Sequence, residues 1–321
     1  MNDATPIKAP FPYFGGKSKV ADRVWAALGP VENYVEPFAG SLAVLLARPH
    51  TPNVETVNDM DCMISNFWRS LSMAPDEVAA HADWPVNEAD LDARHYWLIC
   101  QKDNLRDLLG QPDRYDAKIA GWWLWGCCAW IGGGWCAGDG PWWHDGDRWR
   151  DDARDAGMGI KRQRPHLGDA GMGINRNTVD IIGLYMQRLA SRLRRVRVCC
   201  GDWERVCGPS PTFRHGMTGV FLDPPYSLEG RAHLYTEECG DVHTRVTAWA
   251  LEQGSNPLMR IVVAGYEGEH NTLESAGWRK EAWKTSGGYG AGRGGQGDIN
   301  KHKERLWFSP HCLAHDQGVL L

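Results

Sequence analysis

The chain lacks three features that would assign a protein to a class at once. It has no basic excess: 35 Lys and Arg stand against 40 Asp and Glu, a net charge of -5, so any nucleic-acid footprint must be local. Its ten cysteines include no Cys-x-x-Cys pair, which disfavours zinc sites and disulfide scaffolds and favours reduced thiols. The N-terminus has no basic start followed by an apolar stretch, so we expect no secretion signal and a cytoplasmic protein.

Tryptophan, by contrast, is abundant, with 17 residues concentrated in the middle of the chain. Residues 119–138, IAGWWLWGCCAWIGGGWCAG, carry no charge and are about as long as a membrane span. Six of them are glycine, and the tryptophans occur throughout the segment rather than at its two ends. We therefore predict a buried helix that runs into a glycine loop, and no membrane association.

Short apolar runs that stop at acids or turn residues alternate with helical patterns. The strand-like runs are ENYVEPFAG, VETVNDMD, VRVCC, GVFL, RIVVAGY and RLWFS. SLAVLLARP predicts a helix that ends at Pro49, and GLYMQRLASRLRRV predicts a helix with Tyr185, Leu189, Leu193 and Val196 on one face. This order predicts an α/β fold with a parallel or mixed sheet covered on both faces. Residues 66–195 are then an insertion, mainly helical and loop.

Four acids stand at the ends of these strands: Glu36, Asp59, Asp202 and Asp223. A single acid after a strand is usually a helix cap or a turn residue, but four in one sheet are harder to explain in that way. The small residues of the EPFAG turn would let the backbone approach a ligand closely, and an acid at the next strand end can accept from ribose hydroxyls. The pattern indicates a nucleoside-cofactor site.

Two glycine motifs carry no such signal. GAGRGG at residues 290–295 fits G-x-G-x-x-G, but no strand precedes it and no helical pattern follows. GGKS at residues 15–18 is only the tail of a phosphate loop, because position 11 is Phe rather than Gly. Neither motif predicts a dinucleotide or triphosphate site, and no metal site is expected.

Four motifs resemble those of Dam-type DNA adenine-N6 methyltransferases: PYFGGK, VEPFAGS, VNDMD and, after a long insertion, FLDPPYS. The resemblance covers residues 11–68 and 196–310. It implies a Rossmann-like class I methyltransferase mixed sheet, with residues 1–65 and 196–321 binding S-adenosylmethionine and residues 66–195 recognising the target. It also implies duplex DNA as the partner, its target base flipped out, and a bacterial or phage-infected cell with restriction-modification as a setting.

The resemblance further implies which residues form the site. The cofactor-binding residues would be Tyr13, Lys17, Glu36, Pro37, Phe38, Gly40, Asp59, Asp202, Trp203 and Asp223. The catalytic residues would be Asp223, Pro224, Pro225 and Tyr226. In the Dam-type enzymes the insertion carries an Asn-Arg…Phe-Asn-Gly segment, where this chain has LWGCCAWIGGGWC. The basic cluster Lys161, Arg162 and Arg164, near several tryptophans, is a candidate for DNA phosphate contacts.

The chemistry of the DPPY motif fits this resemblance. The lone pair of an exocyclic amine on a purine is delocalised, so the amine is a poor nucleophile. The Asp223 carboxylate and the Pro224 carbonyl could accept both of its N–H protons, and the prolines would hold that carbonyl in place. Tyr226 could stack on a base drawn out of the duplex. Two alternatives stay open: cytosine-N4 methylation by the same fold, disfavoured by Asp at the start of the motif, and an inactive DNA-binding protein of this fold.

Overall fold

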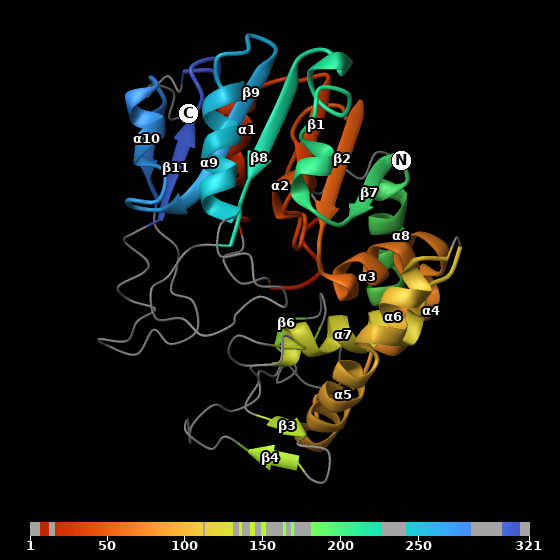
Figure 1. Ribbon diagram of the computed structural model, residues 1–321. Helices are drawn as coiled ribbons and strands as arrows, with labels where there is room; N and C mark the ends of the chain where they lie inside the picture. The colour runs from red at the N-terminus through yellow and green to blue at the C-terminus, as the bar shows by residue number, and fades with distance from the viewer. Residues whose placement is uncertain are drawn as a thin grey trace.

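The computed structural model describes most of the chain. The described residues are 7–12, 17–111, 113–130, 135–136, 142–144, 149–151, 163–164, 168–169, 181–225, 242–283 and 304–314. Within them, seven strands form one sheet in the order β10-β11-β9-β8-β1-β2-β7 (Figure 1). These strands are β1 (Asn33–Glu36), β2 (Val54–Asp59), β7 (Val196–Cys200), β8 (Thr218–Leu222), β9 (Met259–Tyr266), β10 (Arg279–Ala282) and β11 (Glu304–Phe308).

The sheet is mixed. Neighbouring strands from β7 to β9 are parallel, and β11 runs antiparallel to both β9 and β10. The carboxyl ends of β1, β2, β7, β8 and β9 therefore meet at one edge, which is the lower edge of the sheet in Figure 1. Along this series the chain order reverses between β1 and β8, which lie side by side.

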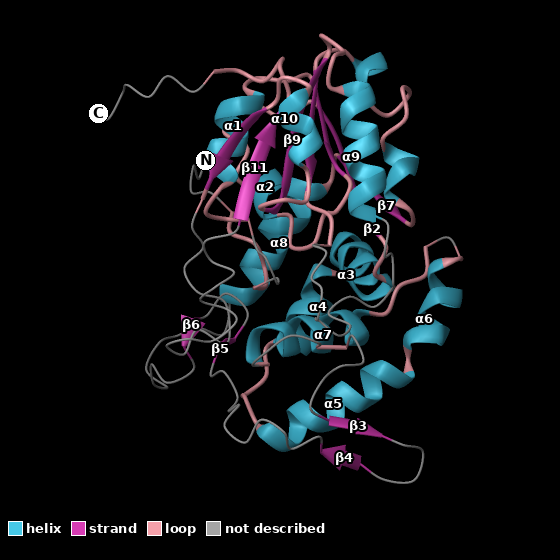
Figure 2. Ribbon diagram, turned by 60° about the vertical axis from the view of Figure 1, so that its left-hand side comes forward, coloured by secondary structure: helices cyan, strands magenta, loops and turns pink. Residues whose placement is uncertain are grey.

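Helices cover both faces of the sheet, as its alternating side chains require. Phe221 of β8 faces one core, while its neighbours Val220 and Leu222 face the other. On the first face lie α1 (Ala21–Leu28), α2 (Ala43–Leu46) and α8 (Ile181–Leu193). On the second lie α9 (Val242–Gln253), which Figure 2 shows beside the sheet, α10 (Asn271–Ser275) and the short 3-10 helix η3 (Trp203–Val206). The 3-10 helix η4 (Phe213–His215) precedes β8.

Five helices between β2 and α8 form a helical part at the carboxyl edge of the sheet. They are α3 (Cys62–Met73), α4 (Pro75–Ala82), α5 (Glu88–Cys100), α6 (Lys102–Leu109) and α7 (Ala117–Ala129). α7 packs on α3, α4 and α5. Two short hairpins follow, β3 (Trp142–His144) with β4 (Trp149–Asp151) and β5 (Gln163–Arg164) with β6 (Gly168–Asp169).

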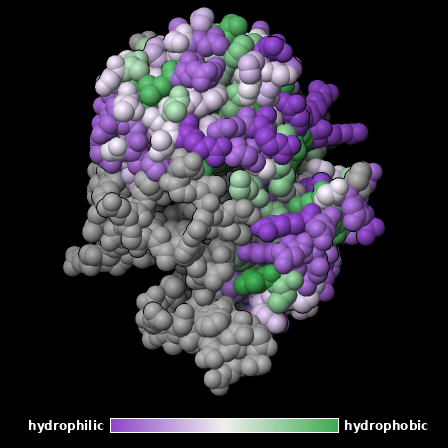
Figure 3. Space-filling model, in the orientation of Figure 1, coloured by the Kyte–Doolittle hydropathy of each residue, from purple (hydrophilic) through white to green (hydrophobic). Residues whose placement is uncertain are grey.

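The helical part shares its core with the first face of the sheet. The Phe11 ring lies 4.8 Å from the Trp123 ring of α7 and 5.8 Å from the Phe67 ring of α3, and all three belong to the cluster that contains Phe221. The expected start of the insertion, between residues 65 and 66, falls inside α3. Hydrophilic residues prevail on the described part of the face drawn in Figure 3.

The predicted strands and the buried helix within residues 119–138 are confirmed. α7 is largely buried, and within the described residues no helix is both long and apolar enough to cross a membrane. The prediction that Val196 extends the helical face of Tyr185, Leu189 and Leu193 is wrong. The helix ends at Leu193, and after two turn residues Val196 begins β7.

Candidate active site

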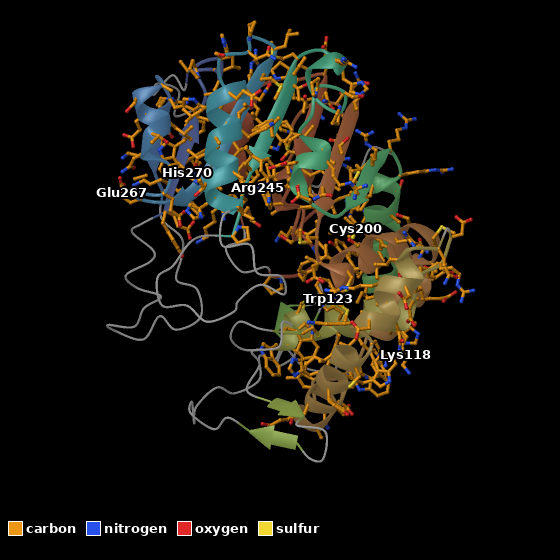
Figure 4. All side chains as sticks on the ribbon, viewed as in Figure 1. Lys118, Trp123, Cys200, Arg245, Glu267 and His270 are labelled. Atoms are coloured by element: carbon orange, nitrogen blue, oxygen red, sulfur yellow. The ribbon has the colours of Figure 1, made fainter. Side chains whose placement is uncertain are left out.

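The four strand-end acids gather at one edge of the sheet. Glu36 and Asp59 are the last residues of β1 and β2, Asp223 follows β8 directly, and Asp202 stands two residues after β7. Since these strands are parallel, their carboxyl ends lie together, and open sheets bind ligands at such an edge where the chain order reverses. Figure 4 labels Cys200 and Arg245 along this edge. The four acids noted in the sequence therefore stand at the carboxyl ends of parallel strands of one sheet.

Asp223 is held by a buried lysine. The Lys17 ammonium, from the segment before α1, lies 2.8 Å from Asp223 Oδ1, and the two side chains are 4% and 21% exposed. The ring of Trp283, which follows β10, lies 5.9 Å from the same ammonium. Pro224 is buried and Pro225 is half-buried. Two prolines in succession fix the backbone here, so Asp223 and the Pro224 carbonyl are presented from a rigid segment.

A further acid near this pair, Glu304, was not predicted from the sequence. It opens β11, is 6% exposed, and its Oε2 has no hydrogen-bond partner among the described residues. Its pKa is raised to about 7, chiefly by burial and also by the Asp223 charge, while the Lys17 charge acts in the opposite direction. The one signal in the sequence is an acid at the start of the strand-like run ERLWF.

Glu36 faces the protein interior rather than a ligand. Its Oε2 accepts from the Tyr34 hydroxyl at 3.0 Å and from the Leu45 N–H at 3.1 Å. Burial raises the pKa of Glu36 to about 8, and the nearby charge of Asp223 contributes to this increase. A neutral carboxyl is therefore the main form at neutral pH. In this position Glu36 ties the end of β1 to the turn of α2.

The turn after β1 is fixed to the ends of the neighbouring strands. The Gly40 N–H donates to Asp59 Oδ2 at 2.9 Å, with Gly40 at a φ of 46°, a left-handed value that glycine adopts without strain. The buried Asn58 amide donates to the carbonyls of Pro37 at 3.1 Å and Gly201 at 2.9 Å. Thus β1, β2 and β7 present one connected rim. Asn58, next to the predicted Asp59, was not identified from the sequence.

Asp59 is both a structural anchor and a candidate ligand group. The N–H groups of Gly40 and Asp61 donate to its two carboxylate oxygens. A carboxylate can accept about four hydrogen bonds, so the half-buried Asp59 keeps acceptor capacity for a ligand. Burial raises its pKa to about 6, against the effect of these N–H donors.

Asp202 and Trp203 form a second, aromatic corner. Asp202 caps η3 through the Glu204 N–H at 2.9 Å, and its other oxygen lies 3.1 Å from Arg245 of α9. Trp203 is 2% exposed, its ring 5.8 Å from that of Phe38, and its Nε1 has no partner within the described part of the chain. The Trp203 ring is therefore part of the core, and Asp202 is already paired with Arg245, a residue that sequence reasoning did not name.

Several predicted site residues are not placed. Tyr13, Tyr226, Lys161 and Arg162 lie outside the described residues, and of Arg164 only the backbone, in β5, is described. Within the described ranges, no group of three or more His, Cys, Asp or Glu side chains could hold a metal ion.

Residues 13–110 match the family model for D12 class N6 adenine-specific DNA methyltransferases. Over these residues the chain is similar to this methyltransferase family. The D12-class match begins at Tyr13 and includes β1, β2 and the turn between Pro37 and Gly40. The DPPY motif lies beyond the matched residues. No curated protein matches the chain significantly.

Proposed function

We propose that the protein transfers a methyl group from S-adenosylmethionine to the exocyclic N6 amine of adenine in duplex DNA. The observation that carries the proposal is the position of Asp223. A carboxylate followed by two prolines stands at the end of β8, beside β1, where the chain order of the sheet reverses. The D12-class match supplies the adenine specificity that the geometry alone does not specify.

The sheet supports a Rossmann-like class I methyltransferase fold. It is open, mostly parallel and covered on both faces, and it reverses its chain order between β1 and β8. In this proposal residues 1–65 and 196–321 form the cofactor-binding catalytic domain, and residues 66–195 form the target-recognition region. The shared core of Phe11, Phe67 and Trp123 would then hold the recognition helices rigidly against the catalytic sheet.

The polar and aromatic residues at the rim fit an adenosyl cofactor. Asp59 retains acceptor capacity for ribose hydroxyls, and the Pro37–Gly40 turn brings backbone close to the same edge. Phe38 is half-buried beside Trp203, which offers an apolar wall for a purine. When bound, S-adenosylmethionine supplies an electrophilic methyl group, and its sulfur retains the electron pair of the broken carbon–sulfur bond.

Asp223 and Pro224 would prepare the target amine. By accepting hydrogen bonds from its two N–H groups, they favour a pyramidal nitrogen whose lone pair is available for the new nitrogen–carbon bond. As that bond forms, the nitrogen becomes positive, and the Asp223 carboxylate stabilises it and accepts the proton that it releases. Tyr226, next along the motif, would stack on the flipped base. Lys161, Arg162 and Arg164 remain the proposed DNA phosphate contacts.

The test is methylation of unmodified duplex DNA by the purified protein, with methyl-labelled S-adenosylmethionine. Digestion to nucleosides followed by mass spectrometry should yield N6-methyladenine, and base-resolution mapping should give the recognition site. N4-methylcytosine as the labelled product would overturn the assigned base. Absence of any labelled nucleoside, from a protein that melts cooperatively, would overturn the function itself.

A further inference from the structure

Four ionisable side chains from four separate segments meet beside the DPPY motif. Lys17 precedes α1, Asp223 follows β8, Glu304 opens β11, and Glu36 ends β1. The Lys17 ammonium is 2.8 Å from Asp223 Oδ1, and the electrostatic effects of Lys17 and Asp223 both reach Glu304. The segment before α1, β8 and β11 thus supply one cation and two of the three carboxyl groups.

Neighbouring residues connect Glu304 to this cluster. Across the sheet it is in register with Tyr266 of β9, and its own carbonyl accepts from the Trp283 N–H at 3.3 Å. The Trp283 ring also lies beside the Lys17 ammonium. The next residue, Arg305, pairs with Glu267 at the exposed edge. Glu304 Oε2, buried and with no hydrogen-bond partner in the described ranges, is therefore a polar atom that remains to be satisfied.

Among the described carboxyl groups of this cluster, Asp223 pairs with Lys17 and Glu304 is affected by its charge. Glu36, the third acid, is mostly neutral at neutral pH and already receives the Tyr34 hydroxyl and the Leu45 N–H. An ammonium group has three donors, so Lys17 can serve two carboxylates. How strongly it engages Asp223 then depends on whether Glu304 carries a charge.

We propose that Glu304 is a positioning residue for methyl transfer. Its charge sets how strongly Lys17 pairs with Asp223. As a carboxylate, Glu304 attracts the Lys17 ammonium, weakens the pairing of Lys17 with Asp223 and makes Asp223 a better acceptor for the target amine. When Glu304 is neutral, it does not attract Lys17. The Lys17 ammonium then pairs more strongly with Asp223, which becomes a weaker hydrogen-bond acceptor. The inference rests on the proposed function, because it concerns the same reaction.

The pH dependence follows from the charge state of Glu304. Its pKa is raised to about 7 by burial and by Asp223, against the opposing effect of Lys17. The charged groups near its strand pair with one another at the surface: Arg305 and Lys280 with Glu267, and Arg279 with Glu281. The carboxylate form is lost as pH falls below about 7, so the rate of methyl transfer should fall in the same range.

The experiment is single-turnover methylation of duplex DNA at saturating cofactor, from about pH 6 to about pH 8, one unit on each side of that pKa. The wild-type rate should rise across this range. Glu304→Gln should be slower by about tenfold at the upper end, the loss expected for one charged partner, and its profile should be flat. Glu304→Asp should recover part of the rise, and cofactor affinity measured by calorimetry should change little.

Three controls separate this role from a structural one. Glu281→Gln, on the neighbouring strand β10, should keep the wild-type profile. In a Lys17→Met background, Glu304→Gln should have no further effect on the profile, because Glu304 acts through Lys17. A Glu304→Gln protein that is slower but rises with pH as wild type does would overturn the proposal. Should Glu304→Gln not fold, a Glu304→Asp profile identical to that of wild type, with no shift in its midpoint, would also overturn it. An inactive wild type would instead contradict the proposed function.

Discussion

Asp223 is the residue on which the proposed chemistry depends most directly. It is partly exposed, held on one oxygen by Lys17 and followed by two prolines. A change that preserves the shape of this side chain but removes its charge is therefore an informative one.

Asp223→Asn should lower the single-turnover rate of methylation by on the order of a hundredfold or more. The amide keeps one acceptor but loses the charge that stabilises the developing positive nitrogen, and such electrostatic partners contribute losses of this size. The matched control is Asp113→Asn, an exposed acid with a φ of 58°, a left-handed value that asparagine tolerates. A folded Asp223→Asn variant with a near-wild-type rate would contradict the assigned role.

Asp59 leads to a prediction about the cofactor. Asp59→Asn should weaken S-adenosylmethionine binding by about tenfold or more, because a hydrogen bond to a charged acceptor is worth roughly 1.5–3 kcal/mol. Since the pKa of Asp59 is about 6, binding to the wild type should also weaken as pH falls through that value. Isothermal titration calorimetry measures both effects, with the exposed Asp22→Asn of α1 as control. Equal affinity in the two variants would remove Asp59 from the cofactor site.

At the scale of elements, the apolar runs identified the central strands and also the edge strand β7, whose sequence VRVCC is mainly apolar. They could not identify β10, whose sequence is RKEA, because this edge strand has three charged residues and no apolar run. The periodicity of Tyr185, Leu189 and Leu193 was correct for α8, but it continued by coincidence into Val196 of β7.

Part of the candidate site was also predictable from the positions at which the apolar runs stop. Acids that directly follow buried strands, such as Asp223, stand out in the sequence because the apolar run stops at them. Glu304 and Arg245 do not stand out, because one begins a strand and the other lies within a helix. Only the fold, which joins segments as distant as Lys17 and Glu304, brings them to the rim.

The junction between α8 and the sheet depends on a buried ion network. Arg192 of α8 donates to both oxygens of Glu55 at 2.7 and 2.9 Å, and Arg48 donates to one of them at 3.1 Å. Glu55 is 2% exposed in this pairing. The network connects α8 to β2, the strand next to the edge strand β7.

Arg192→Met should therefore destabilise the protein by about 1–3 kcal/mol, the cost of leaving a buried charged acceptor with fewer donors. The loss is less than that of an entirely unpaired charge because Arg48 still pairs with Glu55. Urea unfolding measures the difference, and the control is the exposed Arg195→Met two residues after α8, which should change stability by less than about 0.5 kcal/mol. Equal effects of the two substitutions would show that the network contributes nothing specific.

At the scale of the whole molecule, the raised pKa values of the site acids make folding and function oppose each other. Burial raises the pKa of Glu36 to about 8, of Asp59 to about 6 and of Glu304 to about 7. Each is therefore easier to bury as a neutral acid, whereas the proposed chemistry needs Asp59 and Glu304 as carboxylates. The site gains function with rising pH while the fold loses stability from the same groups.

Glu36→Gln isolates the folding side of this opposition. The pKa of Glu36 is about 8 in the folded protein, against the ordinary 4.5, so between these values the folded state binds one proton more than the unfolded state. Its contribution to stability is thus complete below about pH 4.5 and declines as pH rises to about 8, by about 1.4 kcal/mol per unit. Gln stays neutral and lacks this dependence, while Asp59 and Glu304 are common to both proteins.

The free energy of unfolding of the wild type by urea, measured at intervals across this range, should therefore fall relative to that of Glu36→Gln as pH rises. The exposed Glu77→Gln of α4 should follow wild type, and a constant difference between wild type and Glu36→Gln across the range would show that Glu36 is not buried as a neutral acid.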